Sequence, residues 1–222
     1  MKLIIALLVL FLTAWTTMSQ SNVPADKTSS RVSVPVLNED EGKACVVVGD
    51  AFSLVNSAAT PPREPKQYSI FLGKGWLGDK TLSRKNQLSN LFGDPSFTDP
   101  GLLTQLGWNN IYGFKAYKEH LAAESDPLPD LRIQSILSSI VSSDPAAGEV
   151  GDNVYIIYLD PKLSPRLGTL VGSKHYVSYY NAVNIEDGRL RYVVVPYDND
   201  PKTMAANALS GLIAMVFEPN CS

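Results

Sequence analysis

Apolar residues recur at helical spacing in three parts of the chain. Residues 129–142 carry apolar side chains at steps of three and four, the pattern of a helix with one buried face. Residues 81–92 show a shorter stripe of the same kind, and residues 201–217 are apolar on nearly every side. The pattern therefore predicts three helices, the last of them buried. A fourth, short helix is expected within residues 98–107, because Pro100 suits a first helical turn.

Short apolar runs bounded by glycine, proline or aspartate predict the strands. They are residues 44–50, 67–73 and 153–159, and the aromatic stretch 108–118 is also expected to be extended. Strands and helices are mixed without a regular repeat, which is typical of the α+β class. We predict an α+β fold with a single domain, in which a mixed sheet with a C-terminal β-hairpin is packed by three or four helices.

The hairpin is predicted at Asp187-Gly188, a dipeptide that favours a two-residue turn with positive φ. With this turn at its centre, the ladder places Tyr179 opposite Pro196. Four tyrosines of the two strands then have two possible roles. They are cross-strand packing residues, or they form a glycan-binding platform on which sugars stack. These residues are Tyr176, Tyr179, Tyr180 and Tyr192.

Extending the same ladder brings His175 onto one face with Asp198 and Asp200. An imidazole beside two carboxylates could act as an acid and base pair or hold a cation, so these are the candidate catalytic residues. The alternative is structural. Pro196 cannot donate to the ladder, so the pairing would end before Asp198, and Asp200 would cap the following helix with Pro201 at its first position. The sequence leaves both interpretations open.

The N-terminal residues 1–20 have the order of a secretory signal peptide. One basic residue, Lys2, precedes the apolar run Ile4–Trp15 and then small and polar residues. That run is too short to span a bilayer, so we expect a secreted, extracellular protein without a membrane partner after cleavage. Residues 21–43 are polar and are expected to be a flexible entry segment, with a short alternation that could add an edge strand. Residues 44–222 form the predicted globular domain.

Charge and motifs exclude several function classes. The chain has a formal net charge of −3, with lysines and arginines scattered, which does not favour a nucleic-acid partner. The glycine-rich stretch 73–81 departs from the phosphate-binding loop because Asp79 separates Gly78 from Lys80. The sequence has neither a Gly-x-Ser-x-Gly elbow nor a His-Glu-x-x-His motif. It therefore predicts no cofactor and no metal site.

The two cysteines outside the signal region are Cys45 and Cys221. In an oxidising compartment such a pair favours a disulfide, and the alternative is two unpaired thiols. Closing a loop of roughly 175 residues would stabilise the fold by about 4 to 5 kcal/mol in the chain-entropy model.

The order of elements resembles a known family. The segments SIFLGKGWLGDKTLSRKNQLSNLF, LPDLRIQSILSSIVSSDPAAGEVGDNVYIIYLDPKL and NALSGLIAMVFEPN follow one another as in the exordium, or phosphate-induced, proteins of plant cell walls and their bacterial relatives. The resemblance covers 67–220. It is strongest in the last helix, where four residues fall at matching places: Ser210, Leu212, Val216 and Pro219.

The chain departs from that family in ways that bear on chemistry. The cysteine-rich middle and tail of the plant members are missing. Some secreted relatives carry a metallopeptidase-like His-Glu pair in the final helix, where this chain has Ser210 and Gly211. No metal ligand of those relatives therefore has a counterpart in this chain. The resemblance implies a non-catalytic protein acting at a cell surface, wall or matrix, with wall or matrix polysaccharide as a possible partner. The alternatives are a secreted hydrolase or metal-binding enzyme using His175, and a glycan-binding module.

Overall fold

The computed structural model describes seven stretches of the chain: residues 33–38, 42–47, 66–91, 114–120, 127–144, 153–186 and 188–217. The chain divides into two units, residues 1–30 and residues 31–222. All of the described residues belong to the second unit, and the predicted signal peptide lies outside them.

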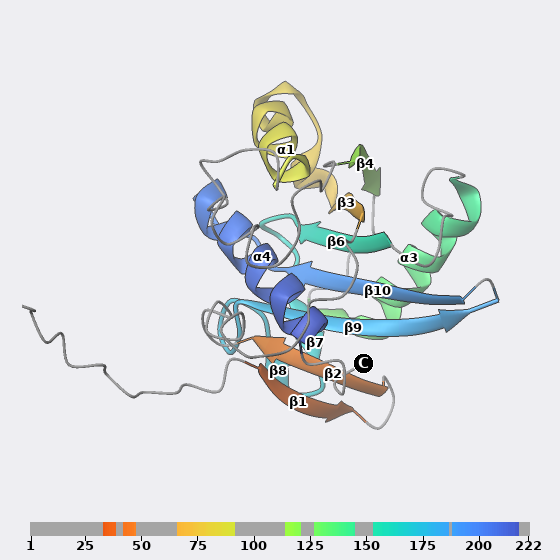
Figure 1. The fold of residues 1–222 in the computed structure, drawn as a ribbon. Coiled ribbons are helices and arrows are strands. Elements are labelled where there is room, and N and C mark those ends of the chain that lie inside the picture. The colour runs from red at the N-terminus through yellow and green to blue at the C-terminus, as the bar shows by residue number, and fades with distance from the viewer. Residues whose placement is uncertain are drawn as a thin grey trace, which may run out of the picture. The chain divides into compact units, whose positions relative to one another are not determined.

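A seven-stranded mixed sheet forms the centre of this unit, and Figure 1 shows its strands in spatial order. Four neighbouring strands are joined by antiparallel pairing, and the last of them continues into a parallel half. The order from one edge to the other is β1 (Ser33–Asn38), β2 (Gly42–Val47), β9 (Ser178–Ile185), β10 (Gly188–Val195), β6 (Asn153–Leu159), β3 (Lys66–Leu72) and β4 (Phe114–His120).

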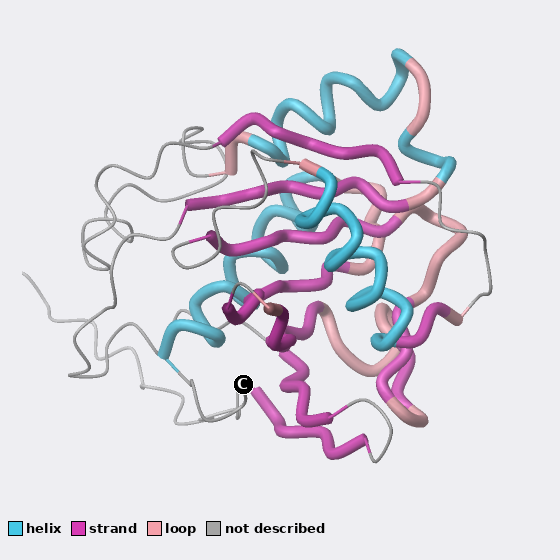
Figure 2. Tube along the Cα trace, turned by 90° about the vertical axis from the view of Figure 1, so that its right-hand side faces the viewer, coloured by secondary structure: helices cyan, strands magenta, loops and turns pink. Residues whose placement is uncertain are grey.

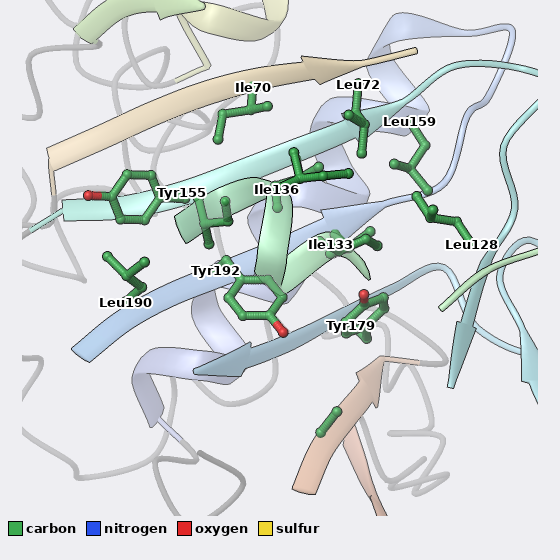
Figure 3. Packing of buried hydrophobic residues seen from close by; sticks show 14 of the residues in the cluster. Ile70, Leu72, Leu128, Ile133, Ile136, Tyr155, Leu159, Tyr179, Leu190 and Tyr192 are labelled. Atoms are coloured by element: carbon green, nitrogen blue, oxygen red, sulfur yellow. The ribbon is translucent and has the colours of Figure 1, made fainter. Parts of the chain in front are cut away.

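Helices cover both faces of the sheet. On one face α4 (Pro201–Phe217) and α1 (Leu82–Ser89) pack over a core that includes Phe71, Tyr158 and Val193. On the other face α3 (Asp130–Ser143) packs over a second core. In Figure 1, α4 passes in front of β9 and β10, and α3 passes behind them. Figure 3 shows side chains of the second core, where Ile133 and Ile136 of α3 meet the strands.

Shorter elements connect these layers, and Figure 2 traces all of the elements by type. Two 3-10 helices, η2 (Lys74–Trp76) and η3 (Asp79–Thr81), lead from β3 into α1. A small three-stranded sheet holds β5 (Leu128–Pro129), β7 (Pro165–Leu167) and β8 (Leu170–Val171).

The connections of the parallel half reverse direction at β3. From β3 the chain reaches its neighbour β4, and from β4 it returns past β3 to β6 on the other side. Right-handed crossovers in opposite directions place their helices on opposite faces, which agrees with α1 and α3 lying on different faces. In open sheets of this kind, the carboxyl ends of the strands at the reversal are the usual place for a ligand.

The structure confirms the predicted α+β class and the mixed sheet. The three helices predicted from periodicity are α1, α3 and α4, and the strands predicted at 44–50, 67–73 and 153–159 are β2, β3 and β6. The edge strand β1 lies within the predicted entry segment 21–43. The short helix expected within 98–107 lies outside the described residues.

The predicted register of the hairpin is wrong by two residues. Ile185 pairs with Gly188, and Tyr179 lies opposite Val194 instead of Pro196. Gly188 has φ 136°, so it begins β10 in a conformation that suits glycine. A shift of two residues leaves each side chain on its predicted face.

Candidate functional site

His175 lies in a tight turn before β9, not in the hairpin ladder. Its backbone N–H donates to the Val171 carbonyl at 3.0 Å, and its Nδ1 lies 2.9 Å from Val171 N and 3.1 Å from Val171 O. When Nδ1 carries no proton it can accept from the Val171 N–H, and when it carries one it can donate to the Val171 carbonyl. The imidazole is therefore held to the backbone of its own turn, and its ring is exposed.

The same turn is packed against the end of β10. Gly172 is buried, and a Cβ at this position would lie 2.6 Å from Pro165 Cγ and 2.8 Å from Pro196 Cγ. Ser173 has φ 64°, a left-handed conformation that is uncommon for a residue with a side chain. Close packing of Gly172 thus fixes the loop that carries His175 at the carboxyl end of β10.

Asp200 has the capping role that the sequence offered as its structural alternative. Its Oδ1 accepts from Lys202 N at 3.1 Å, and its Oδ2 accepts from the Thr203 hydroxyl at 3.1 Å. The bond from Lys202 N is the main cause that lowers the pKa of Asp200. Asp198 accepts from Asp200 N at 2.8 Å. These contacts cap the N-terminus of α4.

The predicted cluster of His175 with Asp198 and Asp200 is not formed by the ladder. β9 begins at Ser178 and β10 ends at Val195, so neither His175 nor Asp198 belongs to a strand. Within the described residues no hydrogen bond or ion pair joins His175 to either aspartate. The physical reason is the one that Pro196 suggests: pairing stops where the donor is missing.

The four candidate glycan-binding tyrosines are buried. Tyr176 is 3% exposed, and the other three, Tyr179, Tyr180 and Tyr192, are fully buried. Tyr180 belongs to the core under α4, and the rest belong to the core under α3. Rings enclosed between a sheet and a helix present no face to a sugar, so the stacking hypothesis is wrong for these residues.

Three of these tyrosines have structural partners instead. The hydroxyls of Tyr179 and Tyr192 donate to the carboxylate of Asp130, the first residue of α3, and the hydroxyl of Tyr176 donates to Pro165 O at 2.8 Å. Figure 3 shows Tyr179 and Tyr192 on the face of the sheet that α3 covers.

Asp130 is the centre of a buried hydrogen-bond network that sequence reasoning missed. Its carboxylate is fully buried and accepts hydrogen bonds from four side chains. The donors are the Tyr179 hydroxyl at 2.5 Å, the Tyr192 hydroxyl at 2.9 and 2.8 Å, Asn181 Nδ2 at 2.9 Å and Gln134 Nε2 at 2.8 Å. The helix dipole at the start of α3 also favours a negative charge here. Burial, followed by the charge of Asp130, raises the pKa of Tyr179 and of Tyr192 well above the ordinary 10.0. The network joins α3 to the hairpin.

A second buried carboxylate stands at the carboxyl ends of β3 and β6. Asp160 is 2% exposed, its Oδ2 accepts from Gly75 N at 2.8 Å, and its Oδ1 accepts from Lys162 N at 2.7 Å. Gly73 has φ 115°, and a Cβ there would lie 2.3 Å from Asp160 Oδ2. The side chain of Asp160 therefore occupies the place at the strand reversal where ligands of such folds commonly bind. The Gly-rich stretch and the Asp-Pro step were the sequence signals of this arrangement.

Arg84 of α1 closes the neighbouring loop after β10. Its Nη1 donates to the Tyr197 hydroxyl at 2.5 Å, its Nη2 donates to Asn199 O at 2.6 Å, and its guanidinium lies 5.4 Å from the centre of the Tyr197 ring. Trp76 packs on the same ring at 5.9 Å. Loops after β3 and β10 are thus fastened together.

The described residues contain no group of three or more metal-ligating side chains. In the same part of the chain, no helix has the length and apolar character needed to cross a membrane. Cys45 is buried in β2, and its predicted partner Cys221 lies outside the described residues, so that disulfide stays a prediction.

The final helix is closely packed against the sheet at Ser210 and Gly211. Ser210 and Gly211 are both buried. A Cβ on Gly211 would lie 2.5 Å from Val193 Cγ1 and 3.1 Å from the Ser178 hydroxyl oxygen. The space beside Gly211 is therefore filled by the sheet.

Comparison of the chain with models of protein families, with curated proteins and with solved structures finds no match.

Proposed function

We propose that this chain is a secreted, non-catalytic protein resembling the exordium group and acting outside the cell at a surface, wall or matrix. The proposal rests on the N-terminal sequence for secretion and on the order of elements for the family. The structure contributes observations that bear on catalysis, the first of them at Gly211.

The packing of Gly211 carries the non-catalytic part of the proposal. Peptidase-like relatives would place a glutamate here, and a glutamate needs room beyond its Cβ. The Cβ position itself already lies 2.5 Å from Val193 Cγ1, closer than real Cβ contacts. This helix position therefore supports packing against β10 and leaves no space for a catalytic side chain.

The other candidate residues support the same proposal through their contacts. His175 is bonded to Val171, and Asp200 caps α4. Asp130 and Asp160 are buried and bonded to tyrosine, amide and backbone donors. Each of these four side chains thus has a structural partner.

The test uses protein purified from culture medium. Mass spectrometry of its N-terminus tests secretion, and we expect a first residue near position 20. Hydrolysis is then measured on protein, ester and polysaccharide substrates with and without added Zn²⁺. We expect no turnover above a blank. A metal- or pH-dependent activity that disappears in His175→Ala and persists in Arg189→Ala, at an exposed residue of β10, would overturn the proposal.

A further inference from the structure

The connections at the carboxyl ends of β3, β6 and β10 are richer in positive charge than the rest of the chain. Residues 73–84, 160–177 and 196–203, which we call the carboxyl-end rim, carry seven lysines and arginines against four aspartates. The remainder carries twelve against eighteen. Charge is therefore divided unevenly, with a positive excess in the connections that follow β3, β6 and β10.

Two lysines of the rim are placed by the same buried carboxylate. Gly75 N and Lys162 N donate to the two oxygens of Asp160, so Lys74 and Lys162 stand on either side of it. Both lysine side chains are exposed. Adjacent strands lie about 4.8 Å apart, which sets the distance between the loops that carry them.

The rim continues on its β10 side with two more cations. Lys174 is exposed in the turn whose Gly172 packs against Pro196. Arg84 is held by Tyr197 and by the carbonyls of the loop after β10. Those partners are neutral, and within the described residues its guanidinium makes no ion pair, so its charge is not cancelled by a carboxylate.

Three of the four acidic residues of the rim are hydrogen-bonded within it. Asp160 is buried, Asp200 caps α4, and Asp198 accepts from Asp200 N. Asp79 is exposed in η3. Three exposed lysines and an arginine held by its neighbours lie on adjacent loops. Such a surface suits an extended anion with repeated charges, because each lysine acts as a point charge.

We infer that the carboxyl-end rim binds an acidic polysaccharide, with Lys74, Lys162, Lys174 and Arg84 facing its carboxylates. The inference rests on the proposed function, because uronate-bearing polysaccharides are the polyanions of walls and matrices outside the cell. A chain of net charge −3 is repelled by a polyanion as a whole, so binding requires positive charge gathered at one place.

The experiment measures binding of the purified, secreted chain to immobilised polygalacturonate, with neutral dextran as the reference surface. We expect binding to polygalacturonate at about 50 mM salt, and loss of most of it at about 500 mM, because exposed charges are screened. The double variant Lys74→Glu with Lys162→Glu should weaken the binding to polygalacturonate by about tenfold or more. The control is the double variant Arg189→Glu with Arg191→Glu, which reverses the same amount of charge at two exposed residues at the opposite end of β10. It should change the affinity for polygalacturonate by less than about twofold.

Several outcomes would overturn the inference. They are no binding at low salt, equal binding to dextran, or equal loss in both double variants, which would indicate net charge instead of a site. Tighter binding to anionic lipid vesicles or to RNA would assign the rim to another class of partner. None of these results affects the hydrolase assay, so failure here is distinguishable from failure of the proposed function. Unchanged melting temperatures show that the variants are folded.

Discussion

Tyr192 donates its hydroxyl to Asp130 at 2.9 Å from one carboxylate oxygen and 2.8 Å from the other. The two residues stand 62 positions apart, one in β10 and one at the start of α3. Both are fully buried. Because a buried charge is tolerated only when it is hydrogen-bonded, this contact fixes where α3 begins on the sheet.

Replacing the carboxylate should destabilise the fold. Asp130→Asn puts an amide donor among hydroxyl and amide donors, and we expect a loss of about 2 to 4 kcal/mol in the free energy of unfolding. Urea denaturation measures it. Tyr192→Phe should cost about 1 to 3 kcal/mol, whereas Tyr158→Phe, which removes one long bond of 3.4 Å from another fully buried tyrosine, should cost less. An equal cost for the two tyrosines would contradict a special role for the network.

Alkaline pH should unfold the protein while its buried tyrosines ionise. Burial, then the charge of Asp130, raises the pKa of Tyr179 and Tyr192 well above 10.0, and burial also raises that of Tyr158. A group whose folded pKa is raised contributes stability that is complete below its unfolded pKa and is lost as pH rises above it. Stability should therefore be flat toward neutral pH and fall above about pH 10.

Absorbance at the tyrosinate band and circular dichroism, recorded together, check this. Exposed tyrosines should ionise first, with the ellipticity unchanged. The buried ones should ionise in a steep step that coincides with loss of ellipticity. Smooth ionisation of all ten tyrosines near pH 10 with the fold intact would show that the rings are accessible.

Local patterns predicted the elements better than their contacts. The spacing of apolar residues sufficed for α3, because one face of that helix is buried and the other is not. Asp187-Gly188 indicated a hairpin but not its register, because Gly188 with φ 136° begins the strand. The alternating tyrosines of β9 suggested an exposed face, yet helices cover both faces of the sheet. Periodicity alone does not show how many faces are covered.

The buried carboxylates could not be predicted for a different reason. The partners of Asp130 in the hairpin are 49 to 62 positions away, so no local motif contains the network. Asp160 is 85 positions from Gly75. Asp200 was accessible to sequence reasoning, because its partners Lys202 and Thr203 follow it directly in a capping pattern.

Asp200 should support α4 and not catalysis. Asp200→Ala removes the acceptor of Lys202 N and should lower the melting temperature, whereas Asp200→Asn keeps a good cap and should lower it less. The pKa of Asp200 is lowered in the folded state. Its contribution to stability is therefore present above the pKa of the unfolded chain, and it is lost as pH falls through the pKa of the folded state. The difference in melting temperature between the wild type and Asp200→Asn should therefore shrink below about pH 3.8, which is the ordinary pKa of this carboxyl group. Asp79→Asn, at another exposed aspartate, is the matched control.

The two cysteines should be joined. The described residues contain no free cysteine, and Cys45 lies at the centre of the antiparallel half of the sheet, paired with Tyr180. We expect no thiol to react in denaturant before reduction and two to react after it. Cys221→Ser should destabilise the secreted protein by about 2 to 5 kcal/mol, because it opens a long loop in the unfolded chain. Detection of two thiols in protein purified without reductant would contradict the bridge.

Packing at Gly211 gives the sharpest test of the final helix. In an unhindered helix, Gly→Ala stabilises by up to about 1 kcal/mol. Here the new methyl group would meet Val193 Cγ1, so Gly211→Ala should destabilise by about 1 to 3 kcal/mol. Val193→Ala removes that atom at the cost of a small cavity. The double variant should therefore be more stable than the sum of the two single effects predicts, by about 1 kcal/mol or more in a double-mutant cycle. Additive effects, or a stabilising Gly211→Ala, would mean that the helix stands farther from β10, and the argument for a closed position 211 would then fail.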